Sequence, residues 1–114
     1  MVKNRIYTPE KGDIVWLNFT PQAGHEQKGR RPALVLSPKE YNSKTGLAIF
    51  CPITSKIKGY PFEVLIKSKK IDGVILSDQV KNLDWTIREA EFIESINKVS
   101  LKEVLDNIKL LILT

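Results

Sequence analysis

Cysteine and histidine are scarce in this sequence, with one residue of each among 114. Cys51 therefore has no partner for an intrachain disulfide, and one histidine with one cysteine cannot form a conventional His/Cys zinc site. We expect the fold to depend on packing alone. A chain of this length buries about two thirds of its unfolded surface. That supports one core, so we expect residues 1–114 to form a single domain and exclude a two-domain enzyme.

Long apolar runs are also missing. Stretches such as Leu110–Leu113 are far shorter than the roughly 20 residues that a membrane-spanning helix needs. The first eleven residues include Lys3, Arg5 and Glu10 and contain no apolar segment of signal-peptide length. The sequence therefore predicts a soluble, cytoplasmic protein with no membrane association.

Several catalytic signatures are absent as well. None of the six glycines lies in a P-loop or a dinucleotide-binding fingerprint, and there is no nucleophile elbow. The acidic residues before residue 82 are scattered singly, whereas a metal-dependent nuclease needs clustered carboxylates. These absences argue against nucleotide hydrolysis and hydride transfer and favour chemistry that uses no metal and no cofactor.

Positive charge is present in excess and is unevenly distributed. The net charge is +5 overall, but residues 1–81 carry +7 and residues 82–114 carry −2. A phosphate-bearing partner is attracted to such a surface with salt-sensitive affinity. A lysine-rich surface that only keeps the protein soluble has the same charge, so a specific site is needed to decide between the two interpretations.

Short β-branched and aromatic segments separated by turn signals predict a mostly β fold. The expected strands are 13–19, 32–37, 47–52, 62–66, 73–76 and 90–96. The second of these is almost continuously apolar, as is typical of a strand covered on both faces. A single helical turn is expected over 39–41, and the polar loops 20–31 and 53–60 are the candidate site loops.

The end of the chain has a helical period. Ser100 and Glu103 have the spacing of a capping box. Apolar residues recur after it at helical spacing: Leu101, Val104, Leu105, Ile108, Leu111 and Ile112. The whole pattern predicts a small, mostly antiparallel barrel or curled sheet with a C-terminal α-helix packed against it.

One loop combines several charged groups. Residues 25–32 contain an acid, an amide and three cations and lead directly into a buried strand, which would hold Arg31 at a rigid edge. A guanidinium there can grip a phosphate through two hydrogen bonds, and Thr54 or Ser55 can add hydroxyl donors. A surface ion pair between Arg31 and Glu26 is the alternative that charge and spacing leave open.

Five blocks of sequence then point to a family. They are GHEQKGRRPALVLSP (24–38), YNSKTG (41–46), PITS (52–55), KGYPFE (58–63) and DGVILSDQVK (72–81). Together and in this order they resemble the MazF/PemK family of toxin endoribonucleases, over about residues 10 to 85. The tail, 86–114, resembles the family only in pattern.

The resemblance implies a small SH3-like barrel and a homodimer. It also implies a sequence-specific, metal-independent endoribonuclease, or mRNA interferase, that cleaves single-stranded mRNA and is neutralised by a cognate MazE-like antitoxin. The family's essential arginine and threonine fall on Arg31 and Thr54, and its conserved acid falls on Glu26. His25 inherits no role from the resemblance.

Metal-free RNA cleavage most simply uses the neighbouring 2′-hydroxyl as nucleophile and leaves a 2′,3′-cyclic phosphate and a 5′-hydroxyl. Arg31 would stabilise charge on the phosphate, Thr54 would hydrogen-bond it, and Glu26 would accept the proton or orient Arg31. His25 is an alternative base, although a lone loop histidine is commonly only solvated. The residues expected to position or read the RNA are Gln27, Lys28, Ser55, Lys56 and Gln79.

The aromatic residues Trp16, Phe19 and Trp85 can stack on bases, but core packing is the expected use of at least two of them. Two rival functions remain open at this stage. One is a toxin of the same fold that inhibits DNA gyrase by binding it, and the other is a basic RNA-binding module without turnover. The Arg31 and Thr54 matches favour the nuclease.

Overall fold

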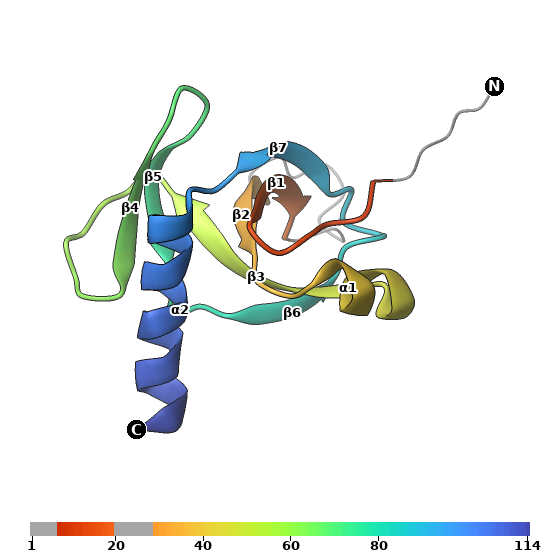
Figure 1. Ribbon diagram of the computed structural model, residues 1–114. Coiled ribbons are helices and arrows are strands. Elements are labelled where there is room, and N and C mark those ends of the chain that lie inside the picture. The colour runs from red at the N-terminus through yellow and green to blue at the C-terminus, as the bar shows by residue number, and fades with distance from the viewer. Residues whose placement is uncertain (1–6, 20–28) are drawn as a thin grey trace.

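The computed structural model describes residues 7–19 and 29–114 (Figure 1). In this part of the chain seven strands and two helices follow one another. In chain order they are β1 (Asp13–Asn18), β2 (Arg30–Val35), α1 (Lys39–Thr45), β3 (Leu47–Thr54), β4 (Glu63–Lys67), β5 (Asp72–Leu76), β6 (Lys81–Asp84), β7 (Glu91–Ser95) and α2 (Lys98–Leu113).

The strands form one curled antiparallel sheet in the order β4-β5-β3-β2-β1-β7, and β6 pairs with β3 beside this path. The eight-residue strand β3 is central, because it pairs with β2, with β5 and with β6 along different parts of its length. This curled sheet with a terminal helix confirms the predicted mostly β, SH3-like architecture.

Apolar side chains gather in two clusters because strand residues point alternately to opposite faces. Ile14 and Leu34 lie in one cluster, whereas Val15, Ala33 and Val35 lie in the other. The residues of β2 from Ala33 to Val35 are fully buried. The expectation that this strand is covered on both faces is therefore confirmed.

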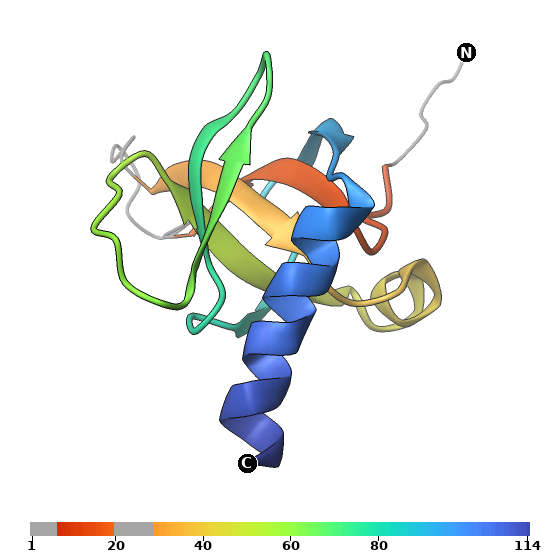
Figure 2. The same cartoon turned by 60° about the vertical axis from the view of Figure 1, so that its left-hand side comes forward.

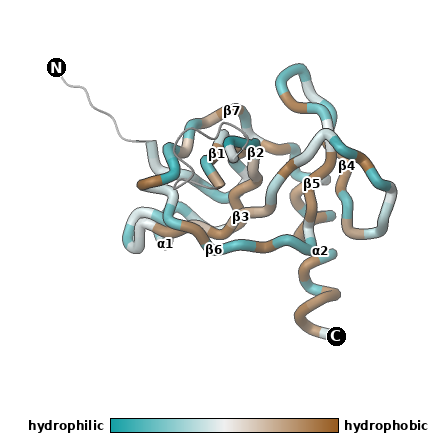
Figure 3. The backbone as a smooth tube through the Cα atoms, turned by 180° about the vertical axis from the view of Figure 1, so that it is seen from behind, coloured by the Kyte–Doolittle hydropathy of each residue, from teal (hydrophilic) through white to brown (hydrophobic). Residues whose placement is uncertain are grey.

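Helix α2 closes the first cluster. Val104 is fully buried, and the partly buried Leu101, Leu105 and Ile108 pack against the same core. The predicted stripe does not stay buried to its end, since Ile112 is 71% exposed and the last turns extend beyond the sheet (Figures 2 and 3). Neither helix of the described chain is long and apolar enough to cross a membrane.

The predicted capping box of α2 is wrong. The helix begins at Lys98, and the Asn97 side chain accepts a hydrogen bond of 2.8 Å from the Ser100 backbone N–H. Asn97 is therefore the N-cap, and Ser100 is the third residue inside the helix. Both residues are good caps by type, and the hydrogen bond from the Ser100 N–H identifies Asn97 as the cap.

Helix α1 is longer than the single predicted turn and extends to Thr45. Asn42, which follows the predicted helical turn 39–41, lies inside the helix and is fully buried, where its amide donates to the carbonyl oxygens of Pro9 and Ser37. Gly46 ends the helix at a φ of 74°, a conformation that glycine adopts without steric cost. Hydrogen bonds to distant parts of the chain thus stabilise the extension of α1, which the local sequence does not predict.

Strand β6 was not predicted. Its sequence, KNLD, has neither the apolar alternation nor the β-branched residues that indicate a strand. It forms because β3 offers backbone hydrogen-bonding groups from Leu47 to Phe50. Strand β3 itself extends two residues beyond the predicted 47–52, so Thr54 ends a strand and does not lie within a loop.

Candidate active site

An open pocket of about 370 Å³ lies where β2 begins and β3 ends. It is lined by Arg30, Arg31, Pro32, Ile53, Thr54, Ser55 and Lys56. Strands β2 and β3 are antiparallel, with Ala33 opposite Pro52. Continuing this register by two residues brings Arg31 opposite Thr54. The two residues that carried the sequence hypothesis therefore line one pocket.

The lining of this pocket suits an anion. It combines the cationic side chains of Arg30, Arg31 and Lys56 with the hydroxyl groups of Thr54 and Ser55. Among the described lining residues there is no carboxylate. Arg31 and Lys56 are exposed and Thr54 is half-buried, so a phosphodiester can reach all three. Arginine binds phosphate through its fork of N–H donors, and the hydroxyls add further donors.

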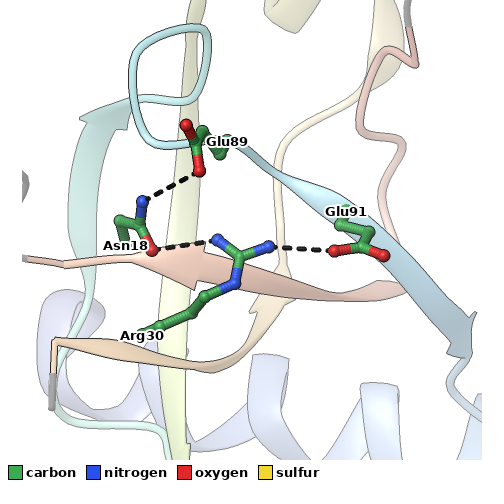
Figure 4. A network of polar contacts seen from close by, with 4 residues as sticks. All are labelled: Asn18, Arg30, Glu89 and Glu91. Atoms are coloured by element: carbon green, nitrogen blue, oxygen red, sulfur yellow. Dashed lines mark hydrogen bonds and ion pairs between the residues drawn. The ribbon is translucent and has the colours of Figure 1, made fainter. Parts of the chain in front are cut away.

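Arg30 is held in a polar network that spans three strands (Figure 4). Its guanidinium donates to the Asn18 side-chain oxygen at 2.9 Å and forms an ion pair with Glu91 at 3.0 Å. The Asn18 amide in turn donates to Glu89 at 3.4 Å. Arg30 thus links β2 to β1 and β7. The sequence analysis chose Arg31 as the site residue and assigned no role to Arg30, because the partners of Arg30 lie far away in the chain.

The hydroxyl of Thr54 has one partner already. Its oxygen accepts a hydrogen bond of 3.2 Å from the backbone N–H of Lys56. A hydroxyl oxygen that accepts from the backbone can still donate its own proton. Thr54 is therefore prepared to act as a hydrogen-bond donor toward an oxygen in the pocket.

The other predicted site residues are not all brought to the pocket. Glu26, Gln27 and Lys28, together with His25, lie outside the described residues. Gln79 is exposed in the turn after β5, where its backbone N–H donates to Leu76, and it does not line the pocket. The structure therefore brings together Arg31, Thr54, Ser55 and Lys56.

Two of the three aromatic residues considered, Trp85 and Phe19, pack in the core, as expected. Trp85 is buried and its indole N–H donates to the Asn42 carbonyl oxygen at 3.0 Å, while Phe19 packs against the second core cluster. Trp16 is 37% exposed and lies opposite Pro32, a pocket residue, in the β1–β2 register. Trp16 is thus the one of the three that is available to a ligand near the pocket.

A second hollow, of about 440 Å³, lies along the last turns of α2 and is lined by Asp106, Lys109, Leu110, Leu113 and Thr114. All of these residues belong to one helix end, so the hollow is a helix surface without convergent polar groups. Within residues 7–19 and 29–114, no three His, Cys, Asp or Glu side chains lie where they could hold a metal ion together.

The fold is thus a small curled β-sheet with a terminal helix, and it carries a basic, hydroxyl-lined pocket whose donors suit a phosphate group. Comparison with known proteins defines its family. The family model described as PemK-like, MazF-like toxin of type II toxin-antitoxin system matches residues 10–112. The chain belongs to this family.

Individual relatives agree with this membership. The chain is 51% identical over 84 residues to the endoribonuclease toxin MazF of Escherichia coli K12, covering 74% of this chain and 76% of that protein. It superposes on the crystal structure of MazF from Deinococcus radiodurans with a TM-score of 0.86 at 51% identity, covering 96% and 100% of the two chains. A MazE-MazF crystal structure from the same organism matches with a TM-score of 0.83 at 45% identity, covering 93% and 96%.

Proposed function

We propose that this chain is a toxin endoribonuclease that cleaves single-stranded mRNA at specific sequences without a metal ion. The observation that supports the proposal is that Arg31, near the start of β2, and Thr54, at the end of β3, line one basic pocket in a chain of the MazF-like toxin family. Its substrate is mRNA, so the cytoplasm is where it acts.

The proposed reaction begins with attack of a ribose 2′-hydroxyl on the adjacent phosphorus. The leaving 5′-oxygen takes a proton, and the products are a 2′,3′-cyclic phosphate and a 5′-hydroxyl. Arg31 stabilises the charge that builds on the non-bridging oxygens, and Thr54 donates a hydrogen bond to the same phosphate. Each such fixed donor contributes roughly 3 to 4 kcal/mol in the transition state. Glu26 accepts the 2′-hydroxyl proton or orients Arg31.

The remaining contacts position the RNA strand. Ser55 and Lys56 extend the pocket beyond Thr54 and suit the next phosphate along the strand. Gln27, Lys28 and Gln79 are the further residues proposed to contact the substrate. Base contacts from these residues would supply the sequence preference, since phosphate contacts carry no sequence information.

The proposed protein partner is a MazE-like antitoxin. MazF of D. radiodurans has been crystallised in a MazE-MazF complex, and this chain is 45% identical to the matched chain. We propose that an antitoxin segment covers the pocket around Arg31 and so excludes RNA. The cationic lining favours an acidic segment at that position.

A second copy of this chain is the other proposed partner. Leu110, Leu111, Ile112 and Leu113 are 50–72% exposed at the end of α2, and monomeric proteins rarely leave such a stretch in water. We therefore expect a homodimer in solution. Ile112→Asp would place a charge on this surface, and sedimentation should then report a monomer. A dimer that survives this change would place the interface elsewhere.

The direct test is incubation of the purified protein with a long RNA, followed by mapping of the cut ends. We expect fragments with 5′-hydroxyl ends, unchanged yield in excess chelator, and no cleavage of a substrate with a single 2′-deoxy sugar at the cut site. Cleavage of the deoxy substrate would exclude hydroxyl attack. Intact RNA together with inhibited DNA gyrase would favour the gyrase-binding alternative.

A further inference from the structure

The pocket wall that carries the hydroxyl groups, Thr54 to Lys56, is in contact with the hairpin formed by β4 and β5. Strand β3 pairs with β5 through two positions, Ile53 with Ile75 and Thr54 with Val74. The pairing ends at Thr54, and the chain then leaves the sheet into the loop 55–62. The position of the wall therefore depends on what holds it just beyond this last pair.

Gly73 is the first contact. It is buried, and a Cβ atom at this position would lie 2.3 Å from the Thr54 carbonyl oxygen, 2.9 Å from the Thr54 carbonyl carbon and 3.2 Å from the Ser55 Cα. These are backbone atoms, which cannot rotate aside as a flexible side chain can. Glycine is thus required here by space, because the backbone of β5 approaches the end of β3 this closely.

Glu63 holds the loop that continues from this wall. This first residue of β4 accepts hydrogen bonds on its carboxylate from the backbone N–H groups of Gly59, at 2.8 Å, and Lys58, at 3.1 Å. Its own backbone N–H donates to the Tyr60 carbonyl oxygen at 3.1 Å. Hydrogen bonds to an ionised carboxylate are stronger than those between neutral groups. Glu63 therefore folds the second half of the loop 55–62 back onto β4.

The same loop is tied to β5 as well. The Tyr60 hydroxyl donates to the Asp78 carboxylate at 3.1 Å, in the turn that follows β5. At the other end, the Lys56 backbone N–H donates to the Thr54 hydroxyl oxygen at 3.2 Å. The loop that begins at the pocket is thus held at its start by the Thr54 hydroxyl and along its second half by Glu63 and Asp78.

We propose that Gly73 and Glu63 are positioning residues for RNA cleavage. Through them the β4–β5 hairpin holds residues 54–56 in place beside Arg31. This inference rests on the proposed function and deepens it. Neither residue lines the pocket, so neither needs to touch the RNA. A displacement of about 1 Å in a catalytic donor can lower a rate about a hundredfold, which is how a contact behind the wall affects the reaction.

The test compares Gly73→Ala, Glu63→Ala and Glu63→Gln with the unaltered protein on an RNA that the latter cleaves. We expect kcat to fall by about ten- to a hundredfold for the two alanine variants while KM changes less than about threefold. Glu63→Gln should lie in between, because its amide keeps one oxygen acceptor. Asp72→Ala and Glu103→Gln, at exposed sites on β5 and α2, should cleave like the unaltered protein.

A second measurement does not depend on activity. Amide hydrogen exchange at Lys58 and Gly59 should become faster in Glu63→Ala and stay slow in Glu103→Gln, because only the former loses the carboxylate that these N–H groups contact. Slow exchange at both amides in folded Glu63→Ala would overturn the role of Glu63.

Unchanged kcat in folded Gly73→Ala and Glu63→Ala would overturn the inference. If Gly73→Ala does not fold, the Glu63 variants alone test the inference. A kcat per folded molecule in Glu63→Ala equal to that of the unaltered protein then overturns the inference. If the unaltered protein cleaves no RNA, the proposed function is overturned instead. Hydrogen exchange needs no activity, so it still tests the Glu63 contact in that case.

Discussion

Arg30 and Arg31 show how two adjacent residues of one type acquire different roles. Both arginines line the pocket near the start of β2. Arg30 also donates to Asn18 and forms an ion pair with Glu91, so it links three strands. The local sequence Arg-Arg-Pro does not distinguish them, and the strands on either side do.

Replacing Arg31 by alanine tests the proposed chemistry. We expect cleavage to fall by at least about a hundredfold, because the guanidinium stabilises the charge on the phosphate in the transition state. The side chain is exposed, so thermal stability should change little. Arg31→Lys, which keeps the charge but loses the two-pronged donor, should recover only part of the rate. Unchanged turnover in Arg31→Ala would remove this residue from the mechanism.

Cys51 should behave as a buried apolar residue. Burial, assisted by the nearby charge of Asp78, raises the pKa of its thiol from 9.0 to about 12. The folded protein should therefore react with a thiol reagent at pH 8 only after unfolding. Rapid labelling of the native protein would contradict this burial.

The same pKa shift makes a prediction about stability. The folded state holds the Cys51 proton more tightly than the unfolded state. The protonated thiol therefore makes its full contribution to the free energy of unfolding below about pH 9, and this contribution is lost as the pH rises toward 12. Urea unfolding at pH 8, 10 and 11 should show a smaller alkaline loss of unfolding free energy for Cys51→Ala than for the unaltered protein. Parallel losses in the two proteins would contradict the shift.

At the scale of elements, local signals located most segments but not all of their ends. The helical stripe from Leu101 to Ile108 indicated α2, since it repeats with the helical period and its residues meet the core. Its N-cap was misassigned to Ser100 because Asn97 and Ser100 are both favoured capping residues. Strand β6 was missed because its stability comes from its partner β3 and not from its own sequence.

The assignment of the N-cap can be measured. Asn97→Ala should lower the free energy of unfolding by about 1 kcal/mol, because it removes the acceptor of the Ser100 N–H. Ser100→Ala should cost less than half of that, since its hydroxyl does not cap the helix. Urea unfolding of the two variants is the comparison, and a larger loss for Ser100→Ala would favour the capping box.

At the scale of the molecule, the excess positive charge of the first 81 residues is of the sign that attracts the proposed RNA substrate over a long range. The pocket then adds the specific contacts, because it gathers cations from β2 and from the segment after β3. The total charge alone does not distinguish an RNA-binding surface from one that only keeps the protein soluble. The presence of Arg31 and Lys56 in one pocket supports the proposed RNA-binding surface.

The charge contribution predicts how binding depends on salt. Affinity for a 2′-deoxy substrate that resists cleavage should fall steeply as salt rises, and Lys56→Ala should reduce the logarithmic slope by about 0.7, the value for one phosphate contact on a single strand. Lys109→Ala, on α2, should leave the slope unchanged. Fluorescence anisotropy at several salt concentrations measures these slopes. Equal slopes for the unaltered protein, Lys56→Ala and Lys109→Ala would show that Lys56 does not contact an RNA phosphate.

The sequence by itself determined the class of fold, the buried second strand and the two residue types at the centre of the pocket. The fold class and the buried strand follow from patterns among near neighbours: apolar alternation, helical spacing and turn residues. Arg31 and Thr54 came from the charged loop before the second strand and from the resemblance to the toxin family. Only the tertiary structure decided that Asn42 lies in a helix, that KNLD is a strand, that Arg30 is committed to β1 and β7, and that Gly73 must lack a side chain. Each of these depends on atoms brought together from distant parts of the chain, and contacts of that kind leave no local pattern to read.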